Sequence, residues 1–126
     1  MRCPKCESEF ETFTYENVEV DRCTSCGGIW FDALEKENLM LIQGAERIDI
    51  GDKRVGKKYN EMQDINCPKC EVKMLRMADK TQFHIEYEFC PTCLSTFFDA
   101  GEFKDLNELT FGERFKKMVD IWLSVR

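Results

Sequence analysis

The sequence predicts a small α+β protein that is stabilised by metal ions and contains two tandem copies of one module. Three observations support this fold class. The eight cysteines of the 126-residue chain all fall in Cys-x-x-Cys pairs, the tetrapeptide Cys-Pro-Lys-Cys occurs twice, and strand-like alternation of apolar and polar residues separates the pairs within each copy. Each module is expected to be a β-hairpin with two Cys-x-x-Cys knuckles, followed by a short helix. The pairs are Cys3 and Cys6, Cys23 and Cys26, Cys67 and Cys70, and Cys90 and Cys93.

The repeat extends beyond the cysteines. The first pairs of the two copies lie 64 residues apart and the second pairs 67, so the second copy is three residues longer between its pairs. The offset of 67 continues afterwards, where WFDALE at 30–35 aligns with FFDAGE at 97–102. Repetition of this length indicates a duplicated structural unit. We divide the chain into a first module, a charged linker, a second module and a C-terminal helix, at residues 1–43, 44–66, 67–109 and 110–126.

Each module begins with a hairpin pattern. In the first copy, apolar residues alternate with polar ones on both sides of Glu16-Asn17, a dipeptide suited to a turn. In the second copy the alternation runs from Phe83 to Phe89, with His84 on the polar side facing solvent. The three extra residues are expected to enlarge this hairpin near Asp79 to Gln82.

A short helix is predicted after each hairpin. Asp32 with Glu35, and Asp99 with Glu102, have the spacing of an N-cap side chain and its reciprocal partner. We interpret these carboxylates as caps rather than as a catalytic acid–base pair, because nothing around them supplies a nucleophile. Gly44 is a plausible end for the first helix.

The last two segments have contrasting compositions. Residues 44–66 carry five positive and five negative side chains and three glycines, which is typical of a solvated linker, with an extended segment expected around Arg47 to Ile50. TFGE at 110–113 is another capping pattern and leads into a predicted amphipathic helix. The apolar stripe of that helix is Phe111, Phe115, Met118, Trp122 and Val125.

Pairs of cysteines separated by 16 or 19 residues have the spacing of a zinc ribbon, in which two knuckles clamp one ion with four thiolates. Two zinc ions per chain are therefore expected, and each would supply stability that so small a core lacks, roughly 10–16 kcal/mol in finger peptides. In the second copy Leu94 and Ser95 replace Gly27 and Gly28, so that knuckle is expected to be strained or shaped differently. The expected ligands are Cys3, Cys6, Cys23 and Cys26 for one ion, and Cys67, Cys70, Cys90 and Cys93 for the other.

Three other uses of the cysteines are less favoured. A redox Cys-x-x-Cys normally opens a helix in a βαβ unit, which two repeated quartets do not resemble. Catalytic zinc keeps an open coordination position, whereas each quartet is already complete, so we expect no enzyme and assign no catalytic residue. A cross-braced arrangement, which would mix pairs from the two copies, remains an alternative to sequential pairing.

The residues resemble a known family. CPKC followed by VEVDRCTSCGGIWFDALE is similar to the bacterial zinc-ribbon family named after transcription factor IIB, whose pattern is Cys-Pro-x-Cys, a hairpin, Cys-x-x-Cys-Gly-Gly-x-Trp and an aspartate-led helix. The match covers residues 1–42, and residues 67–106 look like a diverged second copy. The resemblance implies zinc-binding modules and a link to transcription, but fold-level likeness says little about biological role.

Charge and location narrow the function. Cys3 lies too close to Met1 for a signal peptide, and no stretch is long and apolar enough for a membrane span, so we expect a reducing cytoplasm. The formal net charge of −6, and the acidic first module, favour a basic protein partner over a phosphate backbone. We therefore predict a noncatalytic adaptor in transcription or translation, with the C-terminal helix packing on its own ribbons or on another subunit. The alternatives are a nucleic-acid binder that uses KRVGKK at 53–58, and a zinc store or sensor.

Overall fold

The structure is a computed structural model that describes residues 1–40, 44–62, 64–78 and 85–106. The predicted C-terminal helix, the hairpin insertion near Asp79 to Gln82, and His84 lie outside these residues. In the described part of the chain, no helix has the length and apolar character needed to cross a membrane. The strands are β1 (Phe10–Tyr15), β2 (Val18–Cys23), β3 (Ile29–Phe31), β4 (Leu75–Ala78), β5 (Glu86–Phe89) and β6 (Thr96–Phe98), and the helices are α1 (Glu35–Met40), a 3-10 helix η1 (Ala45–Ile48) and α2 (Lys53–Asn60).

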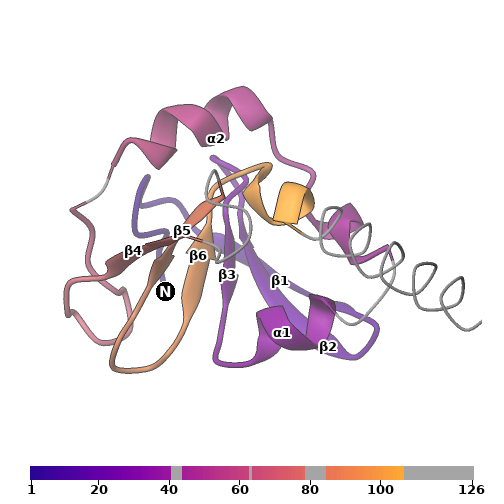
Figure 1. Cartoon of the computed structure of the whole chain (residues 1–126), viewed down its shortest axis with the longest axis horizontal. Coiled ribbons are helices and arrows are strands. Elements are labelled where there is room, and N and C mark those ends of the chain that lie inside the picture. Colours follow the sequence, from indigo (N-terminus) through magenta and orange to yellow (C-terminus); the bar gives the residue numbers. More distant parts are fainter. Residues whose placement is uncertain (41–43, 63, 79–84, 107–126) are drawn as a thin grey trace, which may run out of the picture.

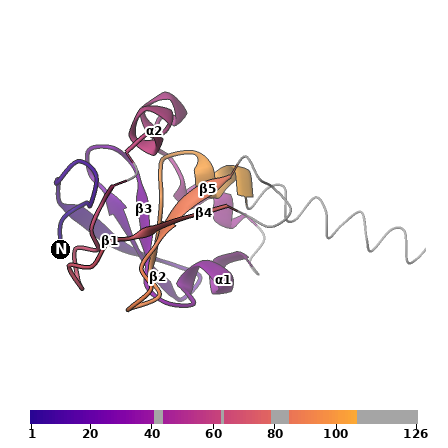
Figure 2. The same cartoon turned by 60° about the vertical axis from the view of Figure 1, so that its left-hand side comes forward.

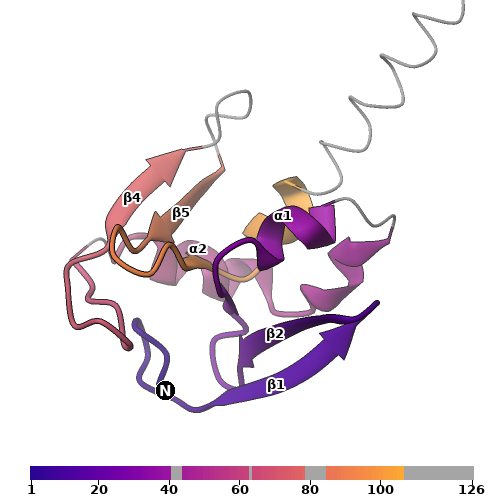
Figure 3. The same ribbon diagram turned by 90° about the horizontal axis from the view of Figure 1, so that it is seen from below.

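The six strands of the described residues form one antiparallel sheet in the order β1-β2-β3-β6-β5-β4. Each copy of the repeat contributes three consecutive strands, and the copies join where β3 pairs with β6. The hairpins β1–β2 and β4–β5 form the two wings of the molecule (Figure 3). The tandem repeat is therefore one continuous sheet rather than two separate sheets.

The first hairpin is confirmed at its predicted turn. Glu16 and Asn17 have φ values of 48° and 68°, and they connect β1 to β2 with Tyr15 opposite Val18. Positive φ at both central residues is typical of the tight turns that match the twist of a hairpin. In the second copy the described part of the hairpin pairs β4 with β5, with Met77 opposite Tyr87.

The join between the copies is symmetric. Trp30 pairs with Phe97, its own counterpart in the repeat, while Ile29 pairs with Phe98 and Phe31 with Thr96. A pseudo-two-fold axis therefore passes between β3 and β6 at Trp30 and Phe97. The two copies meet as the subunits of an isologous dimer do, but within one chain.

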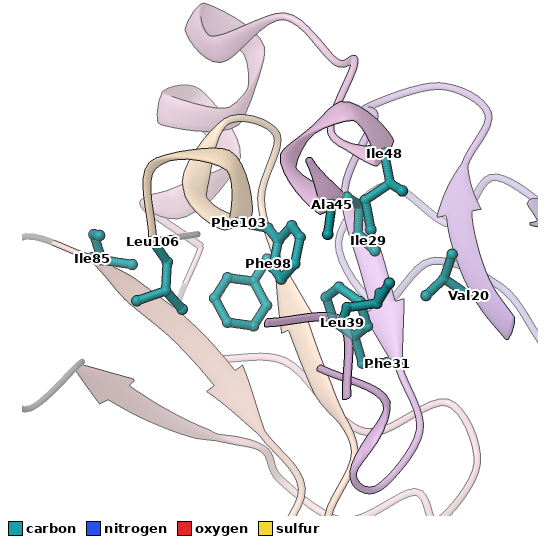
Figure 4. Close-up of a cluster of buried hydrophobic side chains, with 10 residues drawn as sticks. All are labelled: Val20, Ile29, Phe31, Leu39, Ala45, Ile48, Ile85, Phe98, Phe103 and Leu106. Carbon is teal, nitrogen blue, oxygen red and sulfur yellow. The ribbon is translucent and has the colours of Figure 1, made fainter. Parts of the chain in front are cut away.

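Alternation along β3 and β6 divides the core into two clusters, because successive side chains in a strand point to opposite faces. Phe31 and Phe98 belong to a cluster that also receives α1, η1 and the helical residues 102–106 (Figure 4). Trp30 and Phe97 lie in the other cluster with cysteines of both copies, and α2 packs against this cluster through Val55 and Tyr59. Figures 1 and 2 show α2 lying across one end of the sheet.

The prediction of an extended segment around Arg47 to Ile50 is wrong, because Arg47 and Ile48 belong to η1. Gly44, with a φ of 88°, leads into η1, and Arg22 Nη1 donates to the Ile48 carbonyl at 2.8 Å. The following α2 is capped by Asp52, which accepts from the Arg54 amide. The described part of residues 44–66 therefore packs on the sheet, and the boundaries of a separate linker stay a prediction.

The expected helix caps are also corrected. The α1 helix begins at Glu35, whose carboxylate accepts the Asp32 amide at 2.7 Å, but the Asp32 carboxylate does not cap α1. Asp49 fulfils that role for residues 102–106, since its carboxylate accepts the Gly101 and Lys104 amides at 2.9 and 3.0 Å. The cap comes from a distant part of the chain, which spacing rules cannot detect.

Candidate metal centres

Four tight turns, one around each cysteine pair, share a single hydrogen-bond pattern. In each, the amide of the first cysteine donates to the carbonyl five residues later, and the residue after the second cysteine donates to the carbonyl of the first, at 2.8–3.2 Å. The residue after the second cysteine always has a positive φ. These residues are Glu7, Gly27, Glu71 and Leu94, with φ values of 64°, 76°, 60° and 64°.

The first quartet brings Cys3, Cys6, Cys23 and Cys26 together, with all four Sγ atoms within 4.8 Å of one another. Cys3 Sγ lies 3.8 Å from Cys26 Sγ, and Cys6 Sγ lies 3.3 Å from Cys23 Sγ. A tetrahedral ion with Zn–S bonds of about 2.3 Å would hold its sulfurs about 3.8 Å apart. The spacing and the donor set therefore fit zinc.

The second quartet has the same arrangement. The Sγ atoms of Cys67, Cys70, Cys90 and Cys93 also lie within 4.8 Å of one another, and Cys67 Sγ is 3.8 Å from Cys93 Sγ. These separations are far longer than a disulfide bond of about 2.05 Å, and all eight cysteines are free thiols. Each quartet comes from one copy, so pairing is sequential and the cross-braced alternative is wrong.

The turns also prepare the sulfurs electrostatically. The hydrogen bond with Cys26 lowers the pKa of Cys3 to about 5, and the same contact raises the pKa of Cys26. Burial raises the pKa of Cys93, but hydrogen bonds with Ser95, Cys90 and Cys70 together outweigh burial and lower that pKa to about 7. Each quartet thus holds a sulfur that is readily a thiolate, and an ion would displace the remaining protons.

A family model for the transcription factor zinc-finger, a zinc ribbon of the TFIIB type, matches residues 2–41 and 66–109. Together these matches cover well over half of the chain. The chain belongs to this zinc-ribbon family. Searches among curated proteins and among solved structures return no match. Two tandem zinc ribbons, with an antiparallel sheet and a few helices, thus fit two Zn²⁺ ions per chain, each held by cysteines.

The knuckle of the second ribbon that lacks glycine keeps the same shape as its counterpart. Leu94 makes the same backbone hydrogen bond to Cys90 that Gly27 makes to Cys23, at 2.9 and 3.2 Å. Its φ of 64° is one that glycine adopts freely but leucine does not. The sequence predicted that this knuckle would be either strained or shaped differently. The structure shows backbone strain at Leu94 and an unchanged knuckle shape.

The structure also reveals charged residues that sequence reasoning missed. The lysine of each Cys-Pro-Lys-Cys contacts the aspartate after the third strand of the other ribbon. Lys5 Nζ lies 2.6 Å from Asp99 Oδ2, and Lys69 Nζ forms the equivalent ion pair with Asp32. The only sequence signal for these contacts is that the lysine occurs at the same place in both Cys-Pro-Lys-Cys motifs. These reciprocal pairs connect each zinc site to the opposite ribbon.

The Lys5 pair is buried, whereas the Lys69 pair is partly exposed. Glu88 completes the buried cluster, with Oε1 at 3.1 Å from Lys5 Nζ and 2.9 Å from Arg76 Nη2. Burial raises the pKa of Asp99 to about 6, even though Lys5 opposes this shift. Asp32 differs: burial raises its pKa, but its contacts with Lys69, Trp30 and Ser95 together outweigh burial and lower that pKa.

Proposed function

We propose that this chain is a noncatalytic adaptor that uses the eight cysteines to hold two structural zinc ions and presents its ribbons to a protein partner. Four sulfurs around each ion leave no open position for substrate or water, which is the usual arrangement of a structural site. The family name suggests a partner in transcription, and translation remains within the same proposal.

The observation that carries the proposal is the charge of the β1–β2 hairpin and the adjoining knuckle. Lys5 is buried and Arg22 Nη2 is bound to Glu11 at 2.8 Å, so little positive charge is presented there. A surface of this sign attracts a basic protein segment and repels a phosphate backbone. The exposed glutamates on it are Glu7, Glu9, Glu11, Glu16 and Glu19.

The alternative, nucleic-acid binding through KRVGKK, is less favoured by its surroundings. These residues form the first six positions of α2, where Lys53 Nζ is 2.7 Å from Asp105 Oδ2 and Arg54 Nη2 is 3.1 Å from Asp52 Oδ2. Two of the four cations are thus paired with carboxylates. The remaining positive charge is small for a site that must compete with salt for phosphate.

Affinity capture from the native host, with zinc retained and nuclease added, tests the proposal. Changing Glu7, Glu16 and Glu19 together to lysine should abolish capture of the specific protein partner, while Lys57→Glu with Lys58→Glu should leave it intact. Gel shifts at physiological salt provide the opposing readout. Submicromolar binding to DNA or RNA that is lost in the α2 variant would replace the adaptor by the nucleic-acid binder.

Zinc storage or sensing remains a second candidate because the two sites differ. Gly27, with a φ of 76° that glycine adopts freely, follows Cys26 in the first ribbon, whereas the strained Leu94 follows Cys93 in the second. A chain that exchanges one ion at physiological zinc levels, and changes its partner binding as it does so, would favour this function.

A further inference from the structure

The pseudo-two-fold axis relates two surfaces of the molecule, and only one of them is covered by another segment of the described chain. On one, the segment after the first ribbon packs closely. A Cβ added at Gly27 would lie 2.8 Å from Gly51 Cα, and one added at Gly56 would lie 2.0 Å from the Ala100 carbonyl oxygen. Gly101 is likewise in contact with Lys53. Residues 44–60 thus cover the surface formed by Gly27, Ala100 and Gly101.

The symmetry-related surface is an open apolar groove of about 400 Å³. Leu94, Ala33 and Leu34 replace Gly27, Ala100 and Gly101 there, by the offset of 67 that relates the ribbons. The groove lies between the two copies, so both ribbons contribute to it. Its apolar walls are Ala33, Leu34, Met77, Tyr87, Phe89 and Leu94.

The two leucines are unusual in conformation and in exposure. Leu34 has a φ of 72° and Leu94 a φ of 64°, and their glycine counterparts have 90° and 76°. Leu34 is 69% exposed and Leu94 is 54% exposed. Leucine is disfavoured in this backbone region, and water offers its side chain no compensation. Both strained leucines face the same groove, which indicates that apolar material covers it.

The chain contains a segment in the corresponding position. After Leu39 the covering segment continues through η1 into α2, and after Leu106 a further 20 residues, 107–126, lie beyond the described structure. The repeat continues into them, since Glu46-Arg47-Ile48 aligns with Glu113-Arg114-Phe115 at the same offset of 67. The length is sufficient, because the counterpart of Arg126 is Tyr59, near the end of α2.

The tail has larger apolar side chains than residues 44–60 at aligned positions, and the open groove has more space to fill than the covered surface. Where residues 44–60 have Gly51 and Gly56 against glycine and alanine, the aligned positions of the tail are Met118 and Leu123. Ile48 is buried beside Ile29 (Figure 4), and its counterpart Phe115 is larger, while the counterpart of Ile29 is the smaller Thr96 in the groove. The larger apolar residues of the tail thus align with the segment that covers the first surface, and the groove on the second surface has room for them.

We propose that residues 107–126 of the same chain cover this groove, with Phe115 at the position equivalent to Ile48 and the apolar residues from Met118 to Leu123 against Leu34 and Leu94. The second ribbon thereby receives the cover that residues 44–60 give the first. This docking is independent of whether the chain is an adaptor. A second copy of the chain, or a partner, in the groove would be a different outcome.

Trp122 reports directly on the docking. The chain has two tryptophans, and Trp30 is fully buried, so a comparison with Trp122→Phe isolates the Trp122 signal in fluorescence and in fluorotryptophan NMR. The test is made on the full zinc-loaded chain. The groove variant is Leu34→Glu with Leu94→Glu, which adds no new backbone strain, since Glu7, Glu16 and Glu71 already have φ values of 64°, 48° and 60°. The control is Ile50→Glu, whose side chain is as exposed as Leu34 at 69% but lies outside the groove.

The wild type should be a monomer in which acrylamide quenches Trp122 weakly, and the groove variant should keep both zinc ions while the quenching constant of Trp122 rises severalfold. Ile50→Glu should behave as the wild type. Equal quenching in wild type and groove variant would overturn the proposal. Shielding of Trp122 that disappears on dilution, together with dissociation of a dimer, would also overturn it and place a second copy in the groove.

Discussion

Lys5 and Lys69 occupy equivalent positions, yet their ion pairs differ in solvent exposure. The side chains of Lys5 and Asp99 are 0% and 2% exposed, whereas those of Lys69 and Asp32 are 42% and 43% exposed. A charge in a buried pair loses hydration that its partner restores only in part, while a partly exposed pair keeps much of its hydration. The repeat therefore places the same ion pair in two environments with opposite effects on the aspartate pKa.

Asp99→Asn is expected to alter the pH dependence of stability. The folded pKa of Asp99, about 6, lies above its ordinary value of 3.8. Its contribution is therefore fully present below about pH 4 and is lost as the pH rises through 6. The variant should therefore gain stability relative to wild type as the pH rises from about 4 to about 7, by at most about 3 kcal/mol at 1.36 kcal/mol per pKa unit. Thermal unfolding at saturating zinc measures the difference.

Asp32→Asn is the matched control. The pKa of Asp32 is lowered in the folded protein, so its contribution is present above the ordinary value and is lost only in more acidic solution. This variant should show no such relative gain as the pH rises from about 4 to about 7. A similar trend in both variants would mean that burial of Asp99 is not its cause.

At the scale of single elements, α2 depends on a glycine in its middle. Alanine in place of glycine normally stabilises a helix by about 1 kcal/mol. At Gly56, however, the new Cβ would lie 2.0 Å from the Ala100 carbonyl oxygen, which is backbone and cannot turn aside. Overpacking of this kind typically costs about 1–3 kcal/mol. Gly56→Ala should therefore destabilise the protein in chemical denaturation, and Lys58→Ala on the same helix should not.

The second ribbon is expected to release its zinc first. Leu94 occupies a left-handed conformation that costs leucine roughly 1–2 kcal/mol, directly after Cys93. Competition with a chromogenic chelator should therefore empty the site of Cys67, Cys70, Cys90 and Cys93 before the other. Leu94→Gly should slow that release by roughly tenfold, following from the same energy. Earlier loss from the first ribbon would contradict the role given to strain.

These elements show where sequence reasoning succeeds and where it stops. The turn at Glu16-Asn17 and the cysteine knuckles are local, so short patterns predict them. The cap that Asp49 gives to residues 102–106 joins segments about 50 residues apart, and no spacing rule covers it. KRVGKK resembles a loop because of Gly56, but packing against Ala100 requires that glycine within a helix. Tertiary contacts decide such positions.

On the scale of the whole molecule, the continuous sheet couples the stability of the two zinc ribbons. Pairing of β3 with β6, and the reciprocal contacts of Lys5 and Lys69, connect each ribbon to the other. The repeat itself is evident in the sequence, but the pairing of Trp30 with Phe97 is not. Both residues look like ordinary core aromatics, and only the folded sheet shows that an axis passes between them.

Cys23→Ser should therefore produce graded damage. Hydrogen exchange is expected to accelerate most in β1 and β2, to a lesser extent in β3 and β6, and least in β4 and β5, because protection follows distance from the lost site through the sheet. Cys90→Ser should give the reverse order. Equal acceleration throughout the sheet in both variants would show a single cooperative unit instead.

Native mass spectrometry of the intact chain, purified without added metal or chelator, tests the assignment of two zinc sites most directly. We expect a dominant species with two zinc ions and no disulfide, since each sequential quartet fits one ion. A dominant species with a single zinc ion, or with a disulfide in place of either ion, would contradict it.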